Sequence, residues 1–169
     1  MKNLTFVFFA VLCLSVCFLS CGDEMTEPKM IDYTMIPGQG IGNLKIGDLG
    51  SKVKSELGEG FVPIKNEGSY GNASYNYFND PKGIDVIFGQ YSSVDLDVDT
   101  LPIQSFYLFD DFDGMTKEGI KIGSTKAEVI AVYGEPDQMD MWNSVIYNIG
   151  MLISYNDMDV VRSIAILEI

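Results

Sequence analysis

The feature that most constrains how this chain folds is an internal sequence repeat. Residues 44–53 match residues 120–129, and both segments carry Lys-Ile-Gly at the same place. Two further matches follow in the same order, 83–88 with 150–155 and 103–108 with 161–166. A repeated segment of this size encodes one supersecondary unit, so three matches in one order predict that the chain contains a duplicated unit.

Each unit is predicted to begin with a short apolar stretch that ends in Gly, and a helix is predicted to follow it. In the second unit Thr125 and Glu128 fit a capping box, in which the two side chains satisfy free N–H groups at a helix start. In the first unit Asp48 is the expected cap, because carboxylates accept from the same groups. Gly58 and Gly134 suit the left-handed position that ends a helix. Similar start and stop signals therefore frame a helix in both units.

Short strands are predicted after each helix. The segments are β-branched or aromatic and are bounded by Gly, Asn, Asp or Pro. They are 75–78, 84–88 and 103–109 in the first unit, and 145–148, 151–155 and 161–167 in the second. We therefore expect an α+β fold of two tandem repeats, 40–113 and 114–169, each with one main helix packed on an antiparallel β-meander.

The N-terminus carries the signature of a secreted lipoprotein. Lys2 precedes an almost wholly apolar run, 4–19, which is short for a membrane span and typical of a signal peptide. Phe18-Leu19-Ser20-Cys21 resembles the lipobox, because the small Ser20 precedes Cys21. We expect a lipoprotein signal peptide over 1–20 and acyl chains on Cys21 that anchor the protein in a membrane. The alternative is an uncleaved anchor helix.

A tether is predicted to follow the lipid. Residues 21–39 contain Pro28, Pro37 and Gly38 amid mixed polarity, which disfavours regular structure. Gly22-Asp23-Glu24 resembles the acidic signal that sends many Bacteroidetes-type lipoproteins to the cell surface, although a solvated acidic linker explains it equally well. We expect a lipid-anchored outer-membrane protein, on either the periplasmic or the outer side.

Charge and composition restrict the function. The chain has 24 acidic residues, 11 basic residues and no histidine, and loss of Lys2 with the signal peptide leaves a net charge of −14. A chain this acidic repels nucleic acid, so we expect no nucleic-acid partner. The chain has no histidine, and no cysteine follows Cys21, which together exclude Ser–His and Cys–His catalysis and most zinc sites. Catalysis by paired carboxylates stays open, but we expect a non-enzymatic protein without a small-molecule cofactor.

Two acidic segments are candidate binding sites. Asp95, Asp97 and Asp99 alternate with apolar residues, which predicts three carboxylates on one face of an exposed edge strand. Such a strand either guards the sheet edge against aggregation or docks a basic partner. Residues 110–114 suggest a calcium loop, but with Gly114 at the invariant glycine the last ligand position falls on Ile120. We interpret this segment as an acidic turn and expect no metal site.

A candidate protein-binding face follows from the strand pattern. We expect Ile164 and Ile166, with the matching Phe106 and Leu108, to face the helix. The opposite face then shows large apolar groups with no helix to cover them, which indicates an interface unless a loop or the other repeat covers them. Those groups are Tyr107, Phe109 and Leu167.

The second half resembles a known lipoprotein family. Gly123-Ser124-Thr125, Glu128-Val129 and Tyr133-Gly134-Glu135-Pro136 look like the helix signature of the SmpA/OmlA (BamE) type of outer-membrane lipoprotein, and Trp142 and the strand 161–166 are similar too. The tandem arrangement resembles the beta-lactamase inhibitory protein. Both resemblances imply binding to another envelope or secreted protein, by analogy of fold alone. The alternative is an inhibitor or immunity protein that binds a basic toxin or enzyme.

Overall fold

The structure, a computed structural model, describes residues 31–68, 71–92, 95–139 and 143–169. Within it, Ile31–Ile169 form one compact unit. The expected signal peptide 1–20, Cys21, the tether up to residue 30 and Trp142 lie outside the described residues. No helix in the described part of the chain is both long and apolar enough to cross a bilayer.

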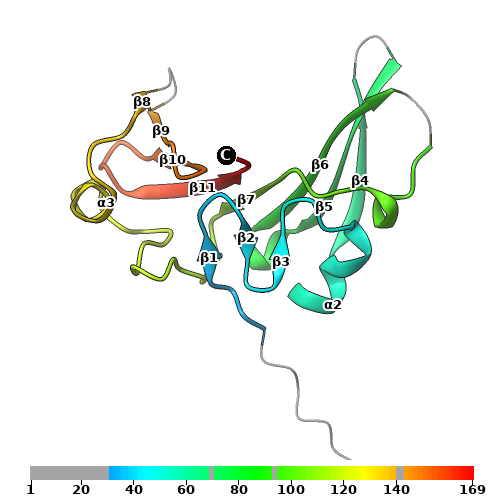
Figure 1. Ribbon diagram of the computed structural model, residues 1–169, viewed down its shortest axis with the longest axis horizontal. Helices are drawn as coiled ribbons and strands as arrows, with labels where there is room; N and C mark the ends of the chain where they lie inside the picture. The colour runs from blue at the N-terminus through cyan, green and yellow to red at the C-terminus, as the bar shows by residue number, and fades with distance from the viewer. Residues whose placement is uncertain (1–30, 69–70, 93–94, 140–142) are drawn as a thin grey trace, which may run out of the picture. The chain divides into compact units, whose positions relative to one another are not determined.

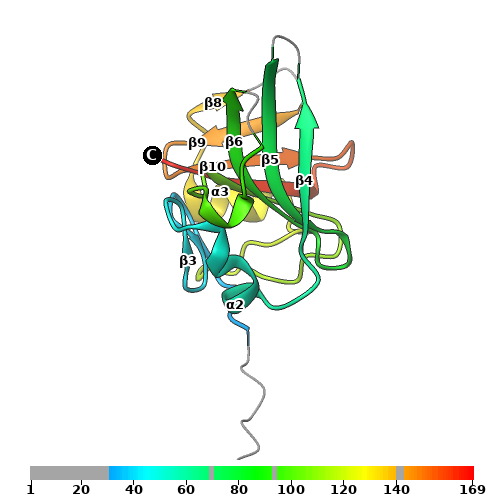
Figure 2. The same ribbon diagram turned by 90° about the vertical axis from the view of Figure 1, so that its right-hand side faces the viewer.

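Most of the compact unit is one eight-stranded antiparallel sheet (Figures 1 and 2). Its spatial order is β4-β5-β6-β7-β11-β10-β9-β8, so two meanders join where β7 pairs with β11. The strands are β4 (Val62–Glu67), β5 (Asn72–Asn79), β6 (Ile84–Ser92), β7 (Ser105–Phe109), β8 (Gln138–Met139), β9 (Ser144–Tyr147), β10 (Met151–Tyr155) and β11 (Val161–Leu167).

Short elements surround the large sheet. A small sheet in the order β1-β2-β3 consists of Met35–Ile36, Gly40–Ile41 and Leu44–Lys45. The described residues contain two α-helices, α2 (Val53–Leu57) and α3 (Lys126–Tyr133). They also contain three 3₁₀ turns, η1 (Gly50–Lys52), η3 (Asp80–Lys82) and η4 (Val98–Thr100).

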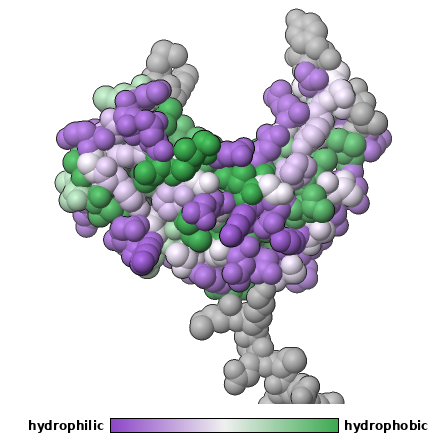
Figure 3. Space-filling view, in the orientation of Figure 1, coloured by the Kyte–Doolittle hydropathy of each residue, from purple (hydrophilic) through white to green (hydrophobic). Residues whose placement is uncertain are grey.

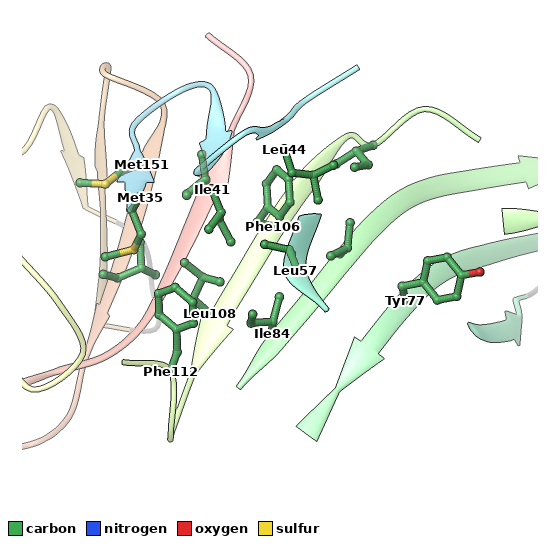
Figure 4. Close-up of a cluster of buried hydrophobic side chains, with 14 of the residues drawn as sticks. Met35, Ile41, Leu44, Leu57, Tyr77, Ile84, Phe106, Leu108, Phe112 and Met151 are labelled. Atoms are coloured by element: carbon green, nitrogen blue, oxygen red, sulfur yellow. The ribbon is translucent and has the colours of Figure 1, made fainter. Parts of the chain in front are cut away.

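The core lies on one face of the large sheet. Phe106 and Leu108 of β7 are fully buried, and Ile41, Leu44 and Leu57 from the small sheet and α2 gather with them in the same cluster (Figure 4). Ile164 and Ile166 of β11 pair with these β7 residues in register and are also fully buried. The expected inward-facing residues of β7 and β11 are therefore confirmed, because alternation along a strand sends every second side chain to the same face.

The predicted α+β fold with two helix-covered repeats is wrong. The protein is mostly β, and α2 and α3 span only five and eight residues. If the two meanders were separate layers, β7 and β11 would each be an unpaired edge strand. Instead β7 and β11 are hydrogen-bonded to one another, which joins the meanders in a single sheet. Gly58, with φ of +83°, ends the first helix directly after Leu57.

Matched segments of the sequence repeat nevertheless make matching local contacts. The N–H of Gly47 donates to the Ile103 carbonyl at 2.7 Å, and the N–H of Gly123 donates to the Val161 carbonyl at 2.8 Å. The capping box of α3 is also present, with Thr125 Oγ1 accepting from the N–H of Glu128. What the matched segments share is thus the backbone bond at Lys-Ile-Gly, and the repeat does not encode two self-contained layers.

The expected cap and tether need correction. The first helical turn begins after Leu49 with no side-chain cap, and Asp48 instead accepts from the N–H of Lys45 at 3.0 Å. Residues 31–39, expected to be tether, belong to the compact unit: Met35 is 1% exposed and its N–H donates to the Met115 carbonyl at 2.9 Å. Burial of an apolar side chain holds this segment against the domain despite its glycines and prolines.

Candidate functional site

The face of the large sheet opposite the core is the candidate site, and we call it the open face. Its middle row crosses all eight strands in register, because each residue pairs with the next in the adjacent strand. The row consists of Val62, Phe78, Asp85, Tyr107, Ala165, Leu152, Ile146 and Gln138. A neighbouring row on the same face consists of Ile64, Asn76, Ile87, Ser105 and Leu167.

The open face keeps apolar side chains in contact with solvent. Tyr107 is 38% exposed and Val62 is 59% exposed, whereas their neighbours Phe106 and Tyr77 on the core side are at most 3% exposed. Leu152, like most members of the two rows, is half-buried. The surface of the compact unit is hollowed on this side of the sheet, with hydrophobic patches among polar ones (Figure 3). Apolar surface of this extent on one sheet face is typical of an interaction site.

Three aromatic rings form a cluster on the open face. Phe78 of β5 stacks on Phe109 of β7 with ring centres 5.8 Å apart and planes 8° apart. Tyr107 stacks on Phe109 with centres 5.7 Å apart and planes 27° apart. The rings pack against one another and so form a rigid platform, which costs little side-chain entropy when a partner binds.

One carboxylate interrupts the apolar row. Asp85 lies between Tyr107 and Phe78 in register, and its Oδ1 accepts from Asn76 Nδ2 at 2.7 Å. Burial raises the pKa of Asp85, and the hydrogen bond from Asn76 offsets only part of this rise. No lysine or arginine in the described part of the chain forms a salt bridge with it. The open face therefore holds an acidic group for which the described residues provide no cation.

The three site residues predicted from the strand pattern lie together on the open face. Tyr107 and Phe109 come from β7, and Leu167 from the adjacent β11. Phe78 and Asp85 were missed, although alternation within the predicted strands 75–78 and 84–88 places both on one face. Their signal becomes visible only with the register, because Phe78 is opposite Asp85 and Asp85 is opposite Tyr107.

The acidic segment at Asp95, Asp97 and Asp99 is not an edge strand, which corrects the prediction. Asp97 caps the 3₁₀ turn η4, with its Oδ1 accepting from the N–H of Asp99 at 3.1 Å. Asp95 pairs with Lys65, and Asp99 Oδ1 accepts from the hydroxyl of Tyr77 at 2.5 Å. Each carboxylate thus has a partner within the chain, and the three do not share one face of a strand.

Comparison with known proteins gives little further information. No protein-family model matches the sequence, and no curated protein matches it. The crystal structure of a cysteine-rich secretory protein from Staphylococcus aureus subsp. aureus Mu50 is similar with a TM-score of 0.45 and 14% sequence identity. The match covers 83% of this chain and 51% of that chain, so this chain spans about half of that protein. A similarity this distant carries no argument about function, and the resemblance to SmpA/OmlA-type lipoproteins stays a prediction.

Proposed function

We propose that this protein is a non-enzymatic, lipid-anchored protein of the cell envelope that binds another envelope or secreted protein on the open face of its sheet. The observation that carries the proposal is the apolar row that crosses the open face from Val62 to Ile146. Burial of such surface contributes about 25 cal/mol per Å². A protein with a matching apolar surface would therefore gain stability by docking here.

The shape and composition of the face favour a protein over a small molecule. Small ligands are held in concave pockets with a few convergent polar groups. The open face instead spreads aliphatic side chains, such as Ile87, Leu152 and Leu167, over neighbouring strands beside the aromatic cluster. Aliphatic and aromatic groups side by side, with few charges, are typical of the centre of a protein interface.

Charge argues against a second copy of the same chain as the occupant. The full chain carries a net charge of −13, so two copies repel one another. A neutral or basic partner meets no such repulsion. Electrostatic attraction of this kind mainly speeds the encounter and selects the partner.

The lipid anchor supports the location of the proposed activity. Ser20-Cys21 after the apolar run 4–19 predicts cleavage and acylation, which holds the domain near a membrane surface. Tethering raises the effective concentration of the domain for any partner in the same compartment. We therefore place the proposed partner in the outer membrane, the periplasm or the space just outside the cell.

The proposal is tested by photo-crosslinking in intact cells. A photoreactive phenylalanine analogue replaces Tyr107 in the full-length lipoprotein, and the control carries it at Met158, which is 79% exposed in the turn between β10 and β11. We expect one major crosslinked protein from position 107 that position 158 does not give, and its loss when Leu167→Asp is added. Equal products from both positions, or crosslinks only to a second copy, contradict the proposal. A toxin or secreted enzyme as the crosslinked partner selects the inhibitor or immunity alternative.

A further inference from the structure

Asp85 is the one charged side chain in the two rows of the open face. It lies on β6, the third of the eight strands in the row, with Tyr107 on one side and Phe78 on the other. Cross-strand neighbours of this kind have Cβ atoms about 5 Å apart. Any group that docks over Asp85 therefore also contacts both aromatic side chains.

The surroundings of Asp85 leave its charge poorly compensated. Asn76 donates one hydrogen bond to Oδ1 at 2.7 Å, and no donor to Oδ2 is found among the described residues. A carboxylate among apolar side chains loses part of its hydration, and among the described residues only the amide of Asn76 is found to compensate for it. An asparagine would fill the same space without that cost. A carboxylate at this position thus lowers the stability of the free domain, and it suits a complex in which a cation of the partner compensates its charge.

The neighbouring side chains restrict which cation fits. A metal ion needs several oxygen ligands, and the nearest side chains supply aromatic carbon and one amide. An ammonium group is compact and strongly hydrated, so contact with two rings costs it much of its hydration. A guanidinium is planar and weakly hydrated, stacks on aromatic faces and pairs with both oxygens of a carboxylate. The chemistry at Asp85 therefore matches arginine best.

We propose that the partner inserts an arginine side chain at Asp85, so that the guanidinium pairs with the carboxylate between Tyr107 and Phe78 while apolar residues flanking that arginine cover the rows on either side. This inference rests on the proposed function, because it names the group by which the partner would be recognised. It commits the partner to a surface segment with one arginine among apolar residues. The charge of the chain as a whole adds attraction over distance but does not choose this position.

The test uses a peptide display library with seven random positions, selected on the full-length protein in nanodiscs of zwitterionic lipid. Parallel selections use Asp85→Asn, which keeps the shape and can still accept from Asn76, and Asp157→Asn, which removes one charge from the exposed turn between β10 and β11. A fourth selection uses Tyr107→Ser. Peptides enriched on the unaltered protein are then made with arginine, lysine or citrulline at the enriched position, and their dissociation constants are measured.

We expect arginine to be enriched at one position, flanked by apolar residues, on the unaltered protein and on Asp157→Asn. On Asp85→Asn the apolar preference should persist and the arginine preference should vanish. Replacement of arginine by citrulline should weaken binding to the unaltered protein about tenfold, and lysine should fall between the two.

The outcomes separate the inference from the function on which it rests. Apolar peptides that depend on Tyr107 but show no preference for arginine overturn the inference and leave the open face as a binding site. A preference for arginine that survives Asp85→Asn also overturns the inference, since overall charge then explains the preference. Equal binding of the lysine and arginine peptides removes the argument for a guanidinium. If no peptide depends on Tyr107, the proposed function fails together with the inference.

Discussion

Gly150→Ala should destabilise the protein far more than an alanine at a comparable turn elsewhere. Gly150 follows β9 with φ of +81°, a conformation that side chains disfavour. An added Cβ would lie 2.3 Å from Gly38 Cα and 2.6 Å from the Leu167 carbonyl oxygen. Both neighbours are backbone atoms, so no rotation of a side chain relieves the overlap. The turn after β1 must therefore move away from the large sheet.

Gly119 provides the matched control. Its φ is +91°, its N–H donates to the Thr116 carbonyl at 2.9 Å, and no heavy atom lies within 4 Å of an added Cβ. Gly150 makes the equivalent turn bond to the Tyr147 carbonyl at 3.1 Å. The two substitutions therefore share the conformational cost and differ only in the collision.

The expected magnitudes follow from these two terms. A left-handed conformation costs a residue with a Cβ about 1–2 kcal/mol, which is the whole effect expected for Gly119→Ala. Displacing packed backbone adds about 1–3 kcal/mol, so Gly150→Ala should lose about 2–5 kcal/mol in the free energy of unfolding. With a urea slope of about 2 kcal/mol per molar, its midpoint should lie about 0.5–1.5 M below that of Gly119→Ala.

The assay is urea unfolding of the full-length protein in detergent micelles, followed by circular dichroism. Equal midpoints for the two variants would refute the reasoning, because they would show that the turn after β1 does not press on Gly150. A lower midpoint for Gly119→Ala would refute it more strongly.

Three further predictions follow from single groups. Burial raises the pKa of Asp85 in the folded protein, so its contribution to stability is complete below the unfolded pKa of about 3.9 and is lost as pH rises through the raised value. Asp85→Asn should therefore have a higher melting temperature than the unaltered protein at pH 7. Thermal scans at pH 7 and pH 4 test this, because the difference in melting temperature should close at pH 4. Thr125→Ala removes the oxygen that accepts from the N–H of Glu128 and should lower the free energy of unfolding in urea by about 1 kcal/mol. Thr125→Ser should lower it much less, and equal losses in the two variants would contradict the cap. Cys21→Ser should abolish labelling by a palmitate analogue, and it should release the protein from membranes or leave an uncleaved precursor. Cys17→Ser should change neither the labelling nor the membrane association. A labelled Cys21→Ser protein would show that the lipid is attached elsewhere.

Local signals in the sequence predict local structure well in this protein. The Thr125–Glu128 pair predicts α3, and the alternation in 161–167 predicts β11 and the burial of Ile164 and Ile166, although not that of Ser163 on the other face. These features depend on residues within one turn or one strand, so the sequence contains everything needed to infer them. Gly58 and Gly134 also end their helices with positive φ, +83° and +79°, but ψ of −179° and −169° puts both outside the predicted left-handed helical region.

Features that depend on distant partners were missed. β4, Val62–Glu67, contains Pro63 and three polar or charged residues, so its composition disfavours a strand, and it is held by pairing with β5 along its whole length. The small sheet consists of two-residue strands and exists because Ile41 and Leu44 are buried in the core. Neither result is visible in the local pattern, since tertiary contacts decide both.

The wrong fold class and the misplaced acidic strand have related causes. A duplicated sequence predicts duplicated turns and caps, but α3 has a side-chain cap and α2 has none, and the repeat does not contain the pairing of β7 with β11 that fuses two meanders into one sheet. The alternating acids at Asp95, Asp97 and Asp99 look like a strand, yet Asp97 bonds to the backbone of Asp99 and forms a turn instead. Aspartate side chains compete with the sheet for backbone N–H groups, and here the local bond prevails.

Asp85 connects stability with the proposed function, because the two make opposite demands on it. A carboxylate kept only for the fold should make the protein less stable when replaced. Burial without a cation implies the reverse, so Asp85→Asn should make the free domain more stable at neutral pH and should remove the preference for arginine. A residue that costs stability in the free protein and contributes affinity in the complex is what a binding site requires. A higher melting temperature of Asp85→Asn together with a lost preference for arginine would therefore separate a role in recognition from a role in folding, which neither measurement does alone.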